Sequence, residues 1–142
     1  MKARFKYFLV LSLTLSATIA AIAQPTKWQK ASSWTLYNIR GVKFYKVDLD
    51  SLERYSRRPL NDDSMRSFLS QSVELPPEKA PMWMGAYVTS CIIDQKRHKI
   101  DISSYGGFFF DESNNKFYSL PQNIEKDWLN YLADCAGSLT TQ

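Results

Sequence analysis

The sequence predicts an α+β domain in which an antiparallel β-sheet carries a C-terminal α-helix on one face, tethered by a disulfide bond. Three observations support this fold: aromatic and β-branched runs in the middle of the chain, a final segment with helical periodicity, and one cysteine in each of these parts. The 142 residues, 44% hydrophobic and 14% aromatic, provide enough core for one domain. The aromatic content argues against disorder, and five glycines exclude a collagen-like chain.

Residues 1–23 have the three-part pattern of a secretory signal peptide. Three basic residues precede an apolar run, and the small residue Ala23 favours cleavage before Gln24. The uninterrupted run is shorter than the ~20 residues that a membrane-spanning helix needs. We therefore expect cleavage, with no transmembrane anchor afterwards. No cysteine follows the cleavage point, so we expect a bacterial protein that is periplasmic or secreted to the cell surface and not lipidated.

Cleavage changes the charge of the chain and sets its domain organisation. The formal net charge of +4 falls to +1 without the three basic residues of the signal, and no nucleic-acid-binding motif is present, so we expect no nucleic acid partner. A flexible segment is expected at 24–32, a single domain at 33–137 and a tail at 138–142.

The first half of the domain predicts strands followed by a less defined region. Residues 34–40 and 42–48 are rich in aromatic and β-branched residues, with Gly41 as a bend between them. Residues 50–71 fit either a short helix capped near Asp62 or an irregular edge strand. The prolines that follow require an extended connection to the next strand.

The middle of the chain predicts a three-stranded meander. Residues 82–94 and 99–111 are strand candidates joined by a turn at 95–98, and a short strand at 116–120 follows a second turn. Gly106 and its neighbouring glycine interrupt the second strand and predict a bulge or a close backbone approach.

The last part of the chain predicts an α-helix. Asn123 suits the N-cap and Gly137 the end of the helix. Apolar residues recur at helical spacing between them and form one stripe. The residues of this stripe are Ile124, Trp128, Tyr131, Leu132 and Cys135.

Cys91 and Cys135 are the two cysteines of the chain. In an oxidising compartment, two distant cysteines favour a structural disulfide over a metal pair or a nucleophile. Cys135 lies on the apolar stripe, and the period of two places Cys91 on the strand face of Trp83, Tyr87 and Ile93. These faces can meet, and the bridge would stabilise the fold by about 4 kcal/mol.

The order of several features along the chain resembles a known family. An aromatic residue opens the first strand, an acidic turn follows the second, and the cysteines occupy a mid-chain strand and the terminal helix, at Trp34, Tyr45, Asp48, Ser51, Leu52, Cys91 and Cys135. Together with the export signal, this pattern over residues 33–136 is similar to the surface-adhesin protein E family. The resemblance implies a sheet with a disulfide-held C-terminal helix, binding of host matrix and plasma proteins, and dimers paired through their sheets.

The sequence offers no constellation for catalysis or for a metal. The single histidine, His98, falls on the predicted turn, where no carboxylate is placed to orient it. A zinc site needs about four nitrogen or sulfur ligands, which one histidine and two bridged cysteines cannot supply. The acidic segments 48–53 and 111–115 lack the pattern of a calcium loop and are interpreted as turns. We expect no catalytic residue, no metal and no cofactor.

Two groups of basic residues are candidates for anion binding. Either could hold an acidic polysaccharide, an anionic protein patch or a phosphate surface. The alternative is that they are solvated charges that discourage aggregation between sheets. The residues are Arg54, Arg57 and Arg58 in the first group, and Lys96, Arg97 and Lys99 in the second.

The aromatic residues of the meander raise the question of what covers the second face of the sheet. Phe108, Phe109 and Phe110 are consecutive and cannot all point to one face of a strand. The opposite face is then covered by a partner protein or a second copy of the chain, or by residues 50–80.

These observations favour an exported, non-enzymatic binding protein that resembles surface adhesins for host matrix or plasma proteins. The alternative is a periplasmic or secreted immunity or inhibitor protein that blocks a toxin or a hydrolase. A protein partner is expected in both cases, with an acidic polysaccharide or a sheet-paired homodimer as further alternatives.

Overall fold

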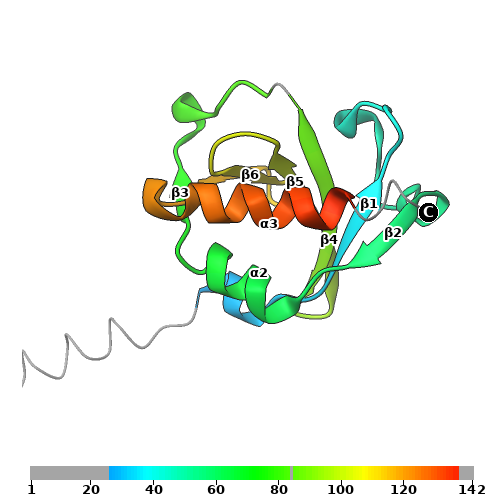
Figure 1. The fold of residues 1–142 in the computed structure, drawn as a ribbon, viewed down its shortest axis with the longest axis horizontal. Coiled ribbons are helices and arrows are strands. Elements are labelled where there is room, and N and C mark those ends of the chain that lie inside the picture. Colours follow the sequence, from blue (N-terminus) through cyan, green and yellow to red (C-terminus); the bar gives the residue numbers. More distant parts are fainter. Residues whose placement is uncertain (1–25, 84, 138–142) are drawn as a thin grey trace, which may run out of the picture.

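A seven-stranded antiparallel sheet forms the frame of the molecule in the computed structural model, which describes residues 26–83 and 85–137 (Figure 1). The strand order is β2-β1-β4-β5-β6-β7-β3. The strands are β1 (Ser32–Asn38), β2 (Ser56–Pro59), β3 (Val73–Leu75), β4 (Ala86–Ile93), β5 (Lys96–Ser103), β6 (Phe108–Asp111) and β7 (Lys116–Ser119). The predicted signal peptide and C-terminal tail lie outside the described residues. None of the helices described is long and apolar enough to span a membrane.

Strands β4 to β7 form a meander, as the sequence predicts, but with one more strand and with different turns. Asp94 and Gln95 adopt left-handed backbone conformations and close a two-residue hairpin, so the predicted turn at 95–98 is wrong. The expected strand at 99–111 divides into β5 and β6. The two strands separate at Gly106, whose φ of +66° belongs to a turn rather than a bulge.

Two α-helices lie on one face of the sheet: α2 (Asp62–Leu69) and α3 (Glu125–Gly137) (Figure 1). Residues 50–71 thus contain both predicted alternatives, the edge strand β2 and the helix α2. The side chain of Asn61 caps α2 by accepting a hydrogen bond from the Ser64 backbone N–H at 2.8 Å. Short 3-10 turns connect the other elements: η1 (Lys27–Lys30), η2 (Phe44–Lys46), η3 (Leu52–Arg54), η4 (Pro77–Lys79) and η5 (Gln122–Ile124).

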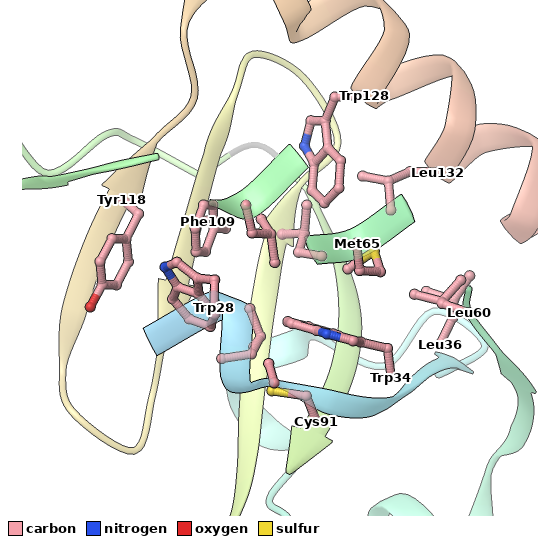
Figure 2. Close-up of a cluster of buried hydrophobic side chains, with 14 of the residues drawn as sticks. Trp28, Trp34, Leu36, Leu60, Met65, Cys91, Phe109, Tyr118, Trp128 and Leu132 are labelled. Carbon is pink, nitrogen blue, oxygen red and sulfur yellow. The ribbon is translucent and has the colours of Figure 1, made fainter. Parts of the chain in front are cut away.

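The main core fills the space between the sheet and the two helices (Figure 2). Trp128 and Leu132 from α3 are fully buried, as the helical stripe predicts. Phe109 is also fully buried on this side and stacks on Tyr118 with the ring centroids 5.0 Å apart. The prediction that the three phenylalanines divide between two faces is therefore correct.

The segment before β1 is part of this core. Trp28 is 3% exposed and contacts the rings of Phe109 and Tyr118, each with a centroid distance of 5.2 Å. The prediction of a flexible segment at 24–32 is wrong for the residues of it that the structure describes. Burial of the tryptophan ring stabilises an ordered turn here. The feature of the sequence that indicated an ordered segment was Trp28 itself.

A smaller core lies on the other face of the sheet. Val47 and Leu52 pack there against Tyr37 and Val88. Residues 42–48, predicted as a strand, form instead the η2 turn and a loop that covers this face. The reason is that β1 is already paired on both sides, with β2 and with β4, so no edge remains for the chain that follows it.

The predicted disulfide between Cys91 and Cys135 is not formed. Cys91 does face the helices, but it lies at the end of the core away from Trp128, beyond the ring of Trp34 (Figure 2). Ala136, next to Cys135, lies instead near Tyr87. Because a strand rises about 3.3 Å per residue, Tyr87 lies about 13 Å along β4 from Cys91, so the end of α3 approaches the sheet away from Cys91.

Candidate functional site

A surface pocket of about 320 Å³ opens where the chain between β1 and β2 approaches the connector that leads into β4. Its lining is largely apolar and aromatic, with Lys43 as the charged member. We name residues 39–46, together with Met82, Trp83, Gly85 and Ala86, the recognition face. The lining residues are Ile39, Val42, Lys43, Phe44, Tyr45, Trp83, Gly85 and Ala86.

Local backbone geometry forms the first wall of the pocket. Arg40 and Gly41 both have positive φ angles, +50° and +79°, which turn the chain sharply out of the sheet after β1. The backbone N–H of Val42 then donates to the Ile39 carbonyl at 3.0 Å and closes the turn. Val47, which is 2% exposed, anchors the far end of this wall in the smaller core.

A buried lysine holds this wall against the sheet. Lys99 is 1% exposed, and its ammonium donates to the carbonyl oxygen of Phe44 at 2.9 Å and to Oε1 of Glu112 at 2.6 Å. The Glu112 backbone N–H donates to the Lys99 carbonyl at 3.1 Å, which keeps the two residues adjacent. A buried ammonium needs such partners, because an unpaired charge in the interior is very unfavourable.

Asp101 completes the buried charge cluster. Its carboxylate is fully buried, with Oδ1 3.1 Å from Nζ of Lys99, yet neither oxygen accepts a well-aligned hydrogen bond from a described residue. Burial, together with a hydrogen bond to Glu112, raises the pKa of Asp101 to about 8. Asp101 is therefore largely protonated at neutral pH, and the cluster is close to electrically neutral.

Aromatic rings extend from the pocket along the same face of the sheet. Trp83 lies 5.6 Å from Phe44 and 6.1 Å from Phe117, measured between ring centroids. Phe117 in turn stacks on Phe110 at 4.4 Å. Residues 42–55 and Trp83 therefore provide much of the cover for this face, which the sequence left open between residues 50–80 and a partner. The sequence placed Trp83 on the same face of the sheet as Cys91, but Trp83 lies on the opposite face.

The rim of the pocket leaves large apolar side chains in contact with solvent. Val42 is 39% exposed, Tyr45 60% and Met82 85%. The Tyr105 hydroxyl donates to the Met82 carbonyl and ties the connector to the end of β5. Several neighbouring apolar side chains that remain exposed are typical of an interaction surface rather than of an isolated exposed residue.

A second pocket, of about 220 Å³, adjoins the first. The two share Ile39 and Ala86 in their linings. The second pocket is otherwise lined from the helical side of the sheet, by Leu36 and Tyr87, whereas Phe44 of the first pocket lies on the other side. Arg40 lines the second pocket, and Ala136 at the end of α3 forms its far side. No acidic residue lines either pocket.

A separate cluster on the helical side of the sheet contains the histidine. His98 is 6% exposed and lies 3.3 Å through Nδ1 from both carboxylate oxygens of Asp111, which also accepts from the Lys27 ammonium at 2.6 Å. The predicted position of His98 on a solvated turn is wrong. The charged run around it resembled a turn, whereas β5 is buried at every position from His98 to Ser103, because both faces of this central strand are covered.

Cys91, His98 and Asp111 occupy three neighbouring strands, in the order of a nucleophile, a base and an orienting carboxylate. Cys91 is fully buried, and burial strongly raises the pKa of its thiol. A thiol in this state is a poor nucleophile, and no substrate reaches it. The arrangement is therefore a packed polar layer of the core.

The predicted anion-binding residues are divided among several environments. Lys99 is in the buried cluster, and Arg97 donates to the Tyr37 hydroxyl at 2.6 Å and lies 3.0 Å from Glu53. Arg57 also pairs with Glu53. Arg54, Arg58 and Lys96 are exposed, and neither of the two predicted groups consists only of exposed, unpaired cations.

Sequence reasoning did not find the recognition face. Its walls come from segments about forty positions apart, and only the fold brings them together. The Arg40-Gly41 bend was visible as a break between two apolar runs, but its role as the start of a pocket wall was not. Among residues 26–83 and 85–137, no group of three or more histidine, cysteine or acidic side chains is arranged to hold a metal ion.

Comparison of the chain with protein-family models, with curated proteins and with solved structures finds no match.

Proposed function

We propose that this chain is an exported, non-enzymatic binding protein that recognises a partner protein through the recognition face. The observation that carries the proposal is the first pocket, which is lined by aromatic and aliphatic side chains of residues 39–45, 83, 85 and 86 and bordered by exposed apolar residues. Binding surfaces are enriched in such aromatic and methionine side chains relative to other surfaces.

Preorganisation of the wall supports the same proposal. The Phe44 carbonyl is bonded to the buried ammonium of Lys99, and Val47 is anchored in the smaller core. Binding to a surface whose backbone is already fixed costs less conformational entropy than binding to a loop that must become ordered. The loop therefore suits recognition even though it contains no regular strand.

Two classes of partner agree with this surface. A host matrix or plasma protein follows from the resemblance to surface adhesins, although the disulfide that forms part of that resemblance is not present. A secreted toxin or hydrolase, blocked by an immunity or inhibitor protein, is favoured by a specific observation: the exposed Arg40 lines the second pocket, next in sequence to Ile39, which lines both pockets. Arginine and aromatic anchors in a concave surface commonly dominate the energy of tight interfaces.

The test is a direct binding measurement with purified candidates of both classes. The exported protein is immobilised, and matrix proteins, secreted hydrolases and toxins are passed over it. Tyr45→Ser is compared with Val73→Ser, because both residues are about 60% exposed but Val73 lies on the edge strand β3, at the other side of the sheet.

We expect Tyr45→Ser to weaken binding of the captured partner about tenfold or more, and Val73→Ser to leave it unchanged. The opposite result would place the binding surface on β3 and would refute the recognition face. Turnover of a captured candidate by the protein would refute the non-enzymatic part of the proposal.

A further inference from the structure

The charge around the recognition face identifies the chemistry of its occupant. The chain from residue 39 to residue 47 contains Arg40, Lys43 and Lys46 and no acidic residue. All three basic side chains are exposed, whereas the mature protein as a whole is expected to be nearly neutral. Positive charge is thus concentrated beside the pocket and would attract a negatively charged partner surface.

The nearest acidic residue of the loop does not cancel this charge by pairing with it. The Asp48 carboxylate accepts the backbone N–H of Ser51 at 2.8 Å, and this hydrogen bond lowers the pKa of Asp48. The Asp48 carboxylate therefore remains ionised, but it bonds within its own turn. Neither Lys43 nor Lys46 forms an ion pair among the described residues.

The shape of the depression favours a segment of a larger molecule over a small ligand. Small-molecule sites enclose about 70–90% of the surface of their ligand. Both pockets here are open to solvent and shallow, and they adjoin through Ile39 and Ala86. Two adjoining open pockets suit neighbouring side chains of one peptide segment.

The apolar rim distinguishes a peptide from other polyanions. An acidic polysaccharide would pair with Lys43 and Arg40 but would leave Val42 and Met82 in water. A peptide that combines acidic residues with an aromatic or aliphatic side chain would satisfy the cations and also cover the apolar surface. The Lys43 ammonium already lies 5.8 Å from the ring centroid of Tyr45, so charged and aromatic contacts would be made side by side.

We infer that the recognition face binds an acidic segment of a partner protein, with at least one large apolar side chain of that segment inserted beside Tyr45 and Trp83. This inference rests on the proposed function and adds the chemistry of the ligand to it. It applies equally to a matrix protein and to a toxin or hydrolase.

The probe is a phage-displayed library of random peptides, selected on the exported protein at low salt. Enriched peptides are synthesised with a fluorophore, and their affinities are measured by fluorescence polarisation at two salt concentrations. Three variants are compared with the wild type: Tyr45→Ser, Lys43→Glu, and Lys126→Glu, an equal charge change at an exposed position of α3. Heparin and anionic lipid vesicles are measured in parallel.

We expect enriched peptides to combine Asp or Glu with Trp, Phe or Leu. Their affinity should fall about tenfold or more with Lys43→Glu and with Tyr45→Ser, and less than about twofold with Lys126→Glu. Added salt should weaken binding, because part of the attraction is between charges.

Four other outcomes contradict the inference, and they separate it from the proposed function. Neutral or basic peptides that still depend on Tyr45 would refute the acidic ligand and leave the recognition face intact. Acidic peptides that ignore both face variants would refute the recognition face as well. Heparin or vesicles bound more tightly than any peptide, with dependence on Lys43 but not on Tyr45, would show a polyanion site instead. No enrichment at all would count against both proposals.

Discussion

The ammonium of Lys99 lies 2.9 Å from the carbonyl oxygen of Phe44 and joins the buried middle of β5 to the loop that shapes the recognition face. The same ammonium pairs with the carboxylate of Glu112 and lies 3.1 Å from Oδ1 of Asp101. One side chain thus neutralises buried charge and fixes the wall of a surface pocket. Its loss should affect both stability and binding.

Lys99→Met should destabilise the fold by about 1–3 kcal/mol, because it leaves the Glu112 carboxylate and the Phe44 carbonyl without their hydrogen-bond donor. Urea denaturation of the variant and the wild type measures this change. The double variant Lys99→Met with Asp101→Leu should recover a large part of the lost stability, since it replaces the buried pair with apolar groups. Equal stability of Lys99→Met and wild type would show that the cluster is hydrated rather than buried.

Asp101 should make the protein less stable as pH rises from about 4 to about 8. The pKa of Asp101 is about 8 in the folded state, and an unfolded aspartate titrates near its ordinary value of 3.8. Within this range the folded state keeps a proton that the unfolded state has released, so the free energy of unfolding falls with increasing pH. Above the folded pKa the effect levels off.

Asp101→Asn is the variant that tests this pH dependence. Asparagine cannot ionise, so the decline between pH 4 and 8 should be reduced, and the variant should be more stable than the wild type near pH 8. Chemical denaturation at several pH values provides the measurement. Parallel curves for the two proteins would assign the proton to another group.

Both cysteines should react with an alkylating reagent when the protein is denatured without a reductant. The reason is that Cys91 and Cys135 occupy different parts of the core and are not bridged. Intact mass spectrometry should then show two added groups per chain, and a mass without any addition would establish the disulfide. In the native protein Cys91 should be protected, because it is fully buried and its thiol pKa is raised.

Leu132→Ala should destabilise the fold by about 2–5 kcal/mol, because it opens a cavity where α3 packs on the sheet. Leu132 is fully buried, and Lys126 on the same helix is exposed. Lys126→Ala is therefore the matched control and should change stability by less than about 0.5 kcal/mol. A loss below about 0.5 kcal/mol in Leu132→Ala as well would contradict the packing of α3 on the sheet through this side chain, since alanine is the stronger helix former and lost propensity cannot destabilise either variant.

The sequence predicts those elements whose periodicity is local. The helix ending at Gly137 follows from the spacing of its apolar stripe, and the meander of β4 to β7 from its runs of aromatic and β-branched residues, and both signals are local in the sequence. The turn at Asp94 and Gln95 was misplaced because the basic residues after it are polar but belong to a strand. Charge in a strand was interpreted as charge in a loop.

Features that depend on pairing between distant parts of the chain could not be predicted from local periodicity. Whether residues 42–48 form a strand depends on whether β1 has an unpaired edge, which is determined by β2 and β4. The distance between Cys91 and Cys135 depends on where α3 crosses the sheet. Periodicity predicts only which face of the strand or helix each cysteine occupies. The burial of Lys99 follows from the loop above it, so its role as an anchor was hidden within an apparent basic cluster.

The strand order also determines when the sheet can form during synthesis. Strand β1 can pair with β2 early, but its second partner is β4, and the only partner of β3 is β7, so β1 and β3 must wait for strands that are made later. The meander is contiguous in the chain, and its hairpins need only short loop closures, which favours its formation first. A chain that emerges from its N-terminus would therefore keep Trp34 and Leu36 exposed until β4 has followed, and would need protection from aggregation during that interval.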